Sequence, residues 1–280
     1  MAYQIHTIDF HQKDAKEKFV DSLKNTGFAV IYNHSINSHL IDNVYKEWSD
    51  FFNSDIKHEY KFDFDKQDGY FPMKSENAKG YSIKDIKEFY HIYLPWGRIP
   101  ENLSENTLKI RSELKKIGNI LLQWIDELTP VNIKRNFSMP LHEMINGSES
   151  NLLRIIHYPP LRDEDDKNAL RAAAHEDINL ITVLLAGSKP GLQVKDTKGN
   201  WVDVKSDYGY LIVNIGDMLQ ECSSNYYPST THRVVNPSQN ENHSRYSMPF
   251  FLHPRDEVVL SDRYTAKFYL EERLKQLGLK

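Results

Sequence analysis

Three residues with metal-binding side chains stand in two short motifs of this 280-residue chain. His175-Glu-Asp177 is the first, and His232 follows Asp177 after 55 positions. Two imidazoles and one carboxylate are a donor set typical of non-haem iron(II), because they leave coordination positions free for oxygen and an organic acid. His-x-Asp alone is a weak signal, since chance produces about one such tripeptide in a chain of this composition. A metal site can therefore be inferred only if the predicted elements around these residues bring them together.

Both motifs adjoin segments that read as strands. Residues 177–186 are rich in apolar and β-branched side chains, which predicts a buried strand. Side chains at i and i+2 share one face of a strand, so His175 and Asp177 can converge if the strand begins just before them. His232 opens a second β-branched run at 231–237. To bind one ion the two strands must lie side by side, as in a small barrel or jelly roll.

A third predicted strand, residues 244–252, carries a candidate site for an anion. Arg245 and Ser247 point to the same side of it, and both of its faces are largely apolar. A buried guanidinium needs an anion to compensate its charge, and its planar fork suits a carboxylate. The hydroxyl of Ser247 and that of Tyr158, on a neighbouring predicted strand, can donate to the same group.

From about residue 151 to 254 the chain resembles the iron(II)/2-oxoglutarate-dependent oxygenases of the isopenicillin N synthase type. The matching stretches are collinear: His175-Glu-Asp177, Gly191-Leu-Gln-Val194, Trp201-Val-Asp-Val204, Val213-Asn-Ile-Gly-Asp-Met-Leu219, Ser229-Thr-Thr-His-Arg-Val-Val235 and Arg245-Tyr-Ser247. Weaker matches at Ile8-Asp-Phe10, Gly27-Phe28 and Asn33-His-Ser-Ile36 extend the resemblance over nearly the whole chain.

The resemblance implies a site residue by residue. His175, Asp177 and His232 would bind Fe(II), with O2 at an open position. The distal carboxylate of 2-oxoglutarate would be held by Arg245, Ser247 and Tyr158. Two positions depart from the family pattern: Ile156 stands where many members have Asn, and Ser35 stands where Gly is usual. The first departure removes one polar contact near the cosubstrate and leaves the metal site intact.

The expected function is oxidation of a small organic molecule by hydroxylation, desaturation or ring closure, coupled to conversion of 2-oxoglutarate to succinate and carbon dioxide. Two alternatives remain at this point. Some members of the family use the Arg-x-Ser pair for the substrate's own carboxylate and need no 2-oxoglutarate. A non-catalytic jelly roll that binds a metal or a small acid would retain the same residues.

The expected fold is mainly β with flanking helices around a double-stranded β-helix, or jelly-roll, core. We expect one oxygenase domain over 1–280, made of an N-terminal α/β cap with supporting helices (1–150), the core (151–254) and a C-terminal helix (255–280). Periodicity predicts strands near 5–10 and 28–32, helices at 12–25, 38–52, 103–128 and 263–277, and a hairpin around 198–200. Leu108, Leu114, Ile117, Leu121 and Trp124 are the expected core positions of the long helix.

Composition limits the partners. Hydrophobic residues make up 40% of the chain and charged residues 26%, with a net charge of −4, so nothing favours nucleic acid or an anionic membrane. No apolar run reaches the length of a membrane span, and no obligate protein partner is evident. The single Cys222 excludes an internal disulfide, and the chain start lacks the features of a secretory signal; both favour the cytoplasm.

The substrate has no motif of its own. Arg171, Tyr70, Tyr81 and Tyr90 are candidates for contact with it because of their positions near the motif or in the cap, although each can equally be structural. Residues 57–66 interleave aromatic and charged side chains, and we interpret them as a solvated amphipathic edge, since the acids cancel the lysines.

Overall fold

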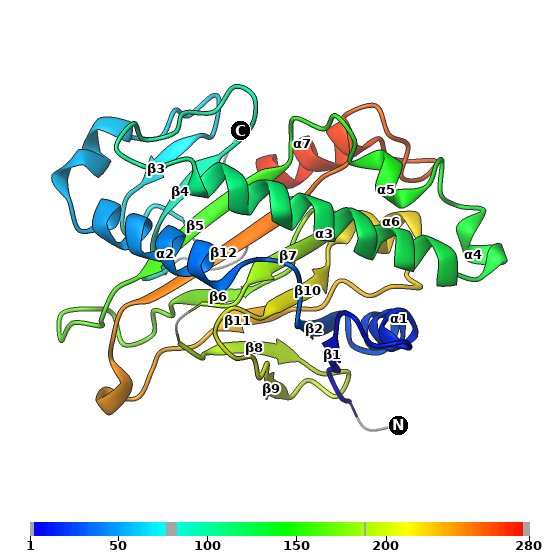
Figure 1. Ribbon diagram of the computed structural model, residues 1–280, viewed down its shortest axis with the longest axis horizontal. Coiled ribbons are helices and arrows are strands. Elements are labelled where there is room, and N and C mark those ends of the chain that lie inside the picture. The colour runs from blue at the N-terminus through cyan, green and yellow to red at the C-terminus, as the bar shows by residue number, and fades with distance from the viewer. Residues whose placement is uncertain (1–2, 77–82, 188, 277–280) are drawn as a thin grey trace.

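Two β-sheets form the body of the molecule in a computed structural model that describes residues 3–76, 83–187 and 189–276 (Figure 1). The larger sheet has eight strands in the order β1 (Thr7–Asp9), β2 (Phe28–Tyr32), β10 (Leu211–Ile215), β7 (Ile181–Leu185), β12 (Arg245–Leu252), β5 (Leu152–Tyr158), β4 (Glu88–Ile92) and β3 (Gly69–Phe71). The smaller sheet has four strands in the order β6 (Ala172–His175), β11 (His232–Val234), β8 (Leu192–Lys195) and β9 (Trp201–Asp203). The predicted hairpin is β8–β9.

Strand alternation gives the larger sheet two apolar faces. On β5, Leu153 and Ile155 belong to the core that also contains the helices, whereas Ile156 and Tyr158 belong to a second core. The second core includes Val194 and other residues of the smaller sheet. The two sheets therefore face each other, as the predicted jelly roll requires, and the helices cover the outer face of the larger sheet.

The helices are α1 (Ala15–Thr26), α2 (Ser38–Phe52), α3 (Asn106–Leu128), α4 (Val131–Lys134), α5 (Leu141–Met144), α6 (Asp217–Cys222) and α7 (Ala266–Gln276), with short 3₁₀ turns at Asp55–Tyr60 and Gln239–Glu241. The long helix α3 lies across the larger sheet beside α2 (Figure 1). It packs against β12 and β7, and it can approach closely because any side chain at Gly118 would meet Leu252.

The expected core of α3 is confirmed at three positions and wrong at one. Leu114, Ile117 and Leu121 are buried, and Trp124 is partly buried against that core, where it stacks on Phe10. Leu108 is 37% exposed. It lies off the buried stripe of the helix, because its neighbours Thr107 and Ile110 in the same turn are the residues that face the core.

The N-terminal third does more than cap the core. Strands β1 and β2 extend the larger sheet at one edge through pairing of β2 with β10, and β4 and β3 extend the other edge through pairing of β4 with β5. Residues before 150 thus share one continuous sheet with residues after it. The division at 150 and 254 stays a prediction about organisation.

None of the helices in the described ranges combines the length and the apolar character needed to cross a membrane.

Candidate functional site

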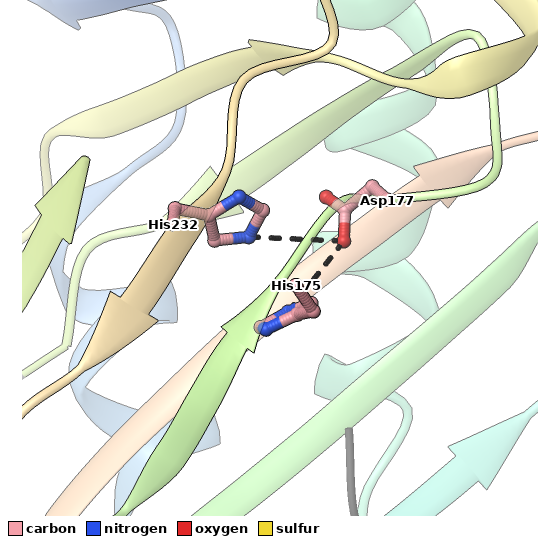
Figure 2. Close-up of side chains that lie close together, drawn as sticks. All are labelled: His175, Asp177 and His232. Atoms are coloured by element: carbon pink, nitrogen blue, oxygen red, sulfur yellow. Dashed lines mark ion pairs between the residues drawn. The ribbon is translucent and has the colours of Figure 1, made fainter. Parts of the chain in front are cut away.

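The two histidines are neighbours across a strand pair of the smaller sheet. His175 is the last residue of β6, His232 is the first of β11, and the two are paired directly in antiparallel register. Their ring centroids lie 4.4 Å apart. The side-by-side strands expected from the sequence are therefore present, and they bring both rings to the same place (Figure 2).

Asp177 reaches the histidines by a different route from the one expected. The predicted strand over 177–186 is observed only from Ile181, so Asp177 lies in the connection between β6 and β7. This connection crosses from the smaller to the larger sheet. The expectation that His175 and Asp177 share one strand face is wrong, because the chain changes sheets between them.

The donor atoms nevertheless converge (Figure 2). Asp177 Oδ1 lies 3.9 Å from Nε2 of His175 and 3.8 Å from Nε2 of His232. One donor atom from each residue falls within 4.8 Å of the others, close enough to share one ion, and no other such group of three occurs among the described residues.

Hydrogen bonds orient both imidazoles. Nδ1 of His175 donates to the carbonyl of Ala173 at 2.8 Å, and Nδ1 of His232 donates to the carbonyl of Thr230 at 3.1 Å. A proton on Nδ1 leaves the lone pair on Nε2, which is the atom that faces Asp177. The His175 side chain keeps 36% exposure because it faces the hollow interior, but burial there and the neighbouring His232 lower its pKa to about 4. The His175 ring is therefore ready to bind a cation as a neutral ligand.

Asp177 is held by two side chains that the sequence analysis did not single out. Its Oδ2 accepts hydrogen bonds from the Thr182 hydroxyl at 2.5 Å and the Asn214 amide at 2.8 Å. Burial alone would raise the pKa of this carboxyl, but the histidines and these two donors lower it. Strand alternation could have found both donors, because each points to the inner face of its strand, β7 or β10.

The predicted anion site is assembled on two paired strands. Arg245 and Tyr158 are register partners on β12 and β5, and the guanidinium centre lies 5.1 Å from the tyrosine ring centre. Arg245, Ser247 and Tyr158 are all buried. Arg245 Nε donates to the carbonyl of Lys189 at 3.0 Å, whereas its Nη1 is buried with no partner among the described residues. A buried cation with a free donor and no carboxylate beside it is suited to a ligand carboxylate.

One cavity of about 1260 Å³ joins these groups. Its walls include the His175, Asp177 and His232 triad and the carboxylate pocket, by which we mean Arg245, Ser247 and Tyr158. Ile156, which departs from the family pattern, is the register partner of Ser247 and adds an apolar surface to the wall. The helix α7 supplies Leu270, Arg273 and Leu274, so the C-terminal helix bounds the cavity.

The earlier substrate candidates lie elsewhere. Tyr70 donates to Glu88, Tyr90 donates to the carbonyl of Arg98, and Arg171 donates to two backbone carbonyls; none of the three is among the cavity's lining residues. Their roles in the structure are hydrogen bonds within the protein. Tyr81 lies outside the described residues.

Other lining residues have no motif in the sequence. Phe62 and Phe64, from the segment interpreted as a solvated edge, line the cavity, although Phe64 is 58% exposed. The cavity is also lined by the charged side chains of Glu76, Lys87 and Arg154. Cys222 is buried outside it, and burial raises the pKa of its thiol, which argues against a nucleophile.

The fold and donor set define a jelly roll of the non-haem iron oxygenase class. Comparison with known proteins gives the same result. Residues 149–254 match the 2OG-Fe(II) oxygenase superfamily, and residues 5–110 match the family described as non-haem dioxygenase in morphine synthesis N-terminal.

The similar proteins point the same way. A proposed oxygenase from Shewanella oneidensis is 51% identical, with a TM-score of 0.89 over 99% of this chain and 100% of that one. The structure of JOX2 in complex with 2OG, Fe and JA is 25% identical, with a TM-score of 0.75 over 91% of this chain and 76% of that one. Jasmonate-induced oxygenase 1 of Arabidopsis thaliana is 28% identical over 263 residues, which cover 89% of this chain and 62% of that protein.

This chain belongs to the 2OG-Fe(II) oxygenase superfamily. The predicted family, its jelly-roll fold and its cofactors, iron(II), 2-oxoglutarate and O2, are confirmed. The chain spans less than two thirds of the Arabidopsis relative's length, so the relatives' reactions are carried over only as a proposal.

Proposed function

We propose that this protein is a 2-oxoglutarate-dependent dioxygenase of a small organic substrate, with His175, Asp177 and His232 as its iron ligands. The observation that carries the proposal is the convergence of their three donor atoms beside a buried arginine, Arg245, that lacks an anion. We assign Arg245, Ser247 and Tyr158 to the distal carboxylate of 2-oxoglutarate. Hydroxylation consumes R–H, 2-oxoglutarate and O2 and yields R–OH, succinate and carbon dioxide. Desaturation or ring closure also yields succinate and carbon dioxide, and the second oxygen atom leaves as water.

When bound, iron(II) and 2-oxoglutarate would supply the oxidising chemistry, because oxidative decarboxylation of the cosubstrate delivers two of the four electrons that reduce O2 and the substrate delivers the other two. The chain's own residues supply geometry and exclusion of water. Thr182 and Asn214 hold one oxygen of Asp177, which leaves Oδ1 for the metal. Tyr158 and Ile156 present buried walls that keep the cosubstrate dry.

Several relatives are named for the small molecules they oxidise, such as gibberellin 2-beta-dioxygenase 3 of Arabidopsis thaliana, and the JOX2 structure holds JA with 2OG and Fe. We extend that class of substrate to this protein. A reducing compartment such as the cytoplasm would suit an iron(II) site and the one free thiol, Cys222.

The test compares the amount of succinate released with the amount of oxygen consumed. Anaerobic addition of 2-oxoglutarate to the iron(II) protein should produce a weak visible charge-transfer band, and admission of O2 should release succinate in step with oxygen consumption. Oxygen consumption by a turning-over substrate without any succinate would instead identify an oxidase that takes all its electrons from the substrate. A protein that binds iron and 2-oxoglutarate but never releases succinate would be a binding protein.

A further inference from the structure

A second set of charges lines the cavity outside the iron ligands and the carboxylate pocket. We call Glu76, Asp85, Lys87, His91 and Arg154 the charged cluster; all five contribute to the cavity wall. Lys87 Nζ lies 2.8 Å from Glu76 Oε2 and 2.8 Å from Asp85 Oδ2. Lys87 is only 6% exposed, and these two carboxylates compensate its buried charge.

The cluster lies next to the iron ligands. Asp85 Oδ1 accepts a hydrogen bond from the backbone N–H of Ala173 at 3.0 Å. The carbonyl of that same Ala173 accepts the Nδ1 proton of His175 at 2.8 Å. A single residue of β6 therefore connects the anchor of Lys87 to a metal-ligating imidazole. A molecule that contacts the cluster would extend toward the metal.

Arg154 presents one defined edge to the cavity. Its guanidinium centre lies 4.5 Å from the ring centre of Phe89 and 5.5 Å from that of Phe251, so aromatic rings flank the cation. Its Nε donates to Nε2 of His91 at 2.7 Å, and His91 in turn donates from Nδ1 to the carbonyl of Gln67. The Nε edge is thereby occupied, and the two Nη atoms remain for an anion.

The present partner of those Nη atoms is a poor one. Glu76 lies 3.3 Å from Nη1 and 3.4 Å from Nη2 of Arg154, longer than the roughly 2.7–2.9 Å of a charge-assisted hydrogen bond. Glu76 is closer to Lys87, at 2.8 Å. Asp85 is already committed to Lys87 and the Ala173 N–H. Arg154 is thus the cation of this cluster with the weakest carboxylate contacts.

The surroundings of Arg154 suit an apolar molecular body. Phe62, Phe71 and Phe89 form a continuous stack with centroid separations of 4.5 Å and interplanar angles of 15° and 13°. These three rings and Phe251 all line the cavity. Along β5, Arg154 is on the same face as Ile156 and Tyr158, so it continues the wall on which the carboxylate pocket lies.

We propose that the substrate is a small carboxylic acid with an aromatic or similarly apolar body, and that its carboxylate binds the Nη edge of Arg154. The acid replaces the weak contact of Glu76 with Arg154, while Glu76 keeps its contact with Lys87. The apolar body lies against Phe62 and Phe251, which line the cavity and are only partly buried. This inference rests on the proposed dioxygenase function, because the acid is the molecule to be oxidised.

The test compares acids with their neutral counterparts on the intact enzyme. The iron(II)–2-oxoglutarate form is titrated anaerobically by calorimetry with benzoate, phenylacetate and 3-phenylpropanoate, and with the primary amide of each. We expect at least one acid to bind with a Kd about tenfold or more below that of its amide. Equal affinity for every acid and its amide would overturn the proposal without the use of any variant.

Two variants assign the preference to this cluster. R154M should abolish the acid–amide difference, whereas R162M, which removes an exposed arginine, should preserve it. E76Q should strengthen acid binding because it removes a competing and repelling carboxylate. If the cluster instead recognised a cation, benzylamine would bind more tightly than the acids, and E76Q would weaken the binding of benzylamine. That result, or an unchanged preference in correctly folded R154M, would contradict the proposal.

The two proposals fail in different ways. A wild-type protein that shows the charge-transfer band and releases succinate, but does not distinguish acids from amides, keeps the dioxygenase function and loses the carboxylic acid substrate. A protein without the band and without succinate loses the dioxygenase function, and the substrate inference, which depends on it, is lost as well.

Discussion

Two carboxylates that line the same cavity, Asp177 and Glu76, are held in opposite ways. Asp177, at the iron site, receives hydrogen bonds on Oδ2 from Thr182 and Asn214, which are neutral and stand on neighbouring strands. Glu76, in the charged cluster, has as its partners Lys87 and Arg154, which are both cations. For each carboxyl burial alone would raise the pKa, and the partners lower it.

The two carboxylates differ in whether a ligand can take the place of one of their partners. Neutral donors on strands fix the position of a metal ligand and leave its charge to the metal, so the geometry of Asp177 persists whatever else enters the cavity. An ion pair between side chains can exchange one partner for an incoming ion of the same charge only if the displaced group keeps another partner, as Glu76 keeps Lys87. We therefore expect the position of Asp177 to stay fixed when a ligand binds. We expect the ion pairs of the charged cluster to rearrange.

The largest effect should follow removal of a metal ligand. H175A deletes one of three donors, and we expect the purified protein to lose stoichiometric iron(II) and to release succinate only at background rates. Metal analysis and a succinate assay measure both losses. H39A, at an exposed position, is the matched control and should behave like the wild type. Normal turnover by H175A would end the metal assignment.

Loss of the buried cation should affect the cosubstrate more than the metal. R245M retains much of the side chain's length and removes the charge, and we expect the Kd for 2-oxoglutarate to rise about 100-fold while iron(II) still binds. The charge-transfer band, titrated with 2-oxoglutarate, gives this constant. The Kd of R245K for 2-oxoglutarate should lie between those of the wild type and R245M. An ammonium keeps the positive charge but lacks the planar pair of donors that a carboxylate accepts from. An unaltered Kd would place the distal carboxylate elsewhere.

The iron site and the charged cluster also differ in how far the sequence predicted them. The convergence of His175, Asp177 and His232 and the pairing of Arg245 with Tyr158 were predictable, because metal and carboxylate chemistry demands particular residue types at positions that strands bring together. The route of Asp177 was not, since the break between β6 and β7 depends on which sheet each segment joins.

The charged cluster had no comparable signal. Glu76 and Lys87 come from the region before the core, and Arg154 is one arginine in an apolar strand; only the pairing of β4 with β5 brings them together. Long-range pairing of this kind is not encoded in a local pattern. The same reason explains why residues before 150 were expected to be a cap, although their strands extend the sheet.

A smaller effect should follow loss of one neutral partner of Asp177. T182V is nearly isosteric and removes the hydroxyl that bonds Oδ2, so we expect iron(II) affinity to fall about tenfold with little change in stoichiometry. It should also reduce the depression of the carboxyl's pKa and move the acid limit of iron binding to higher pH. Competition with a chelator across pH measures both, and T197V, at an exposed position, is the control.

The last effect is on stability alone and concerns His253, a buried histidine of the cavity wall that belongs neither to the iron site nor to the charged cluster. Burial lowers its pKa to about 4, below the ordinary value of 6.5, so its imidazole is neutral in the folded protein when the unfolded chain is already protonated. The unfolded state then binds more protons between pH 6.5 and 4, and stability must fall as the pH is lowered through that window.

For His253 this loss is at most about 3 kcal/mol in the free energy of unfolding. Urea titration of the metal-free protein at pH 6.5, 5.5 and 4.5 should show a decline, and H253Q should make it shallower because glutamine does not titrate. H39Q, at an exposed site, should leave the slope unchanged. An identical slope in H253Q would mean that another buried group controls the acid limit, with His175 the next candidate because its pKa is lowered to a similar value.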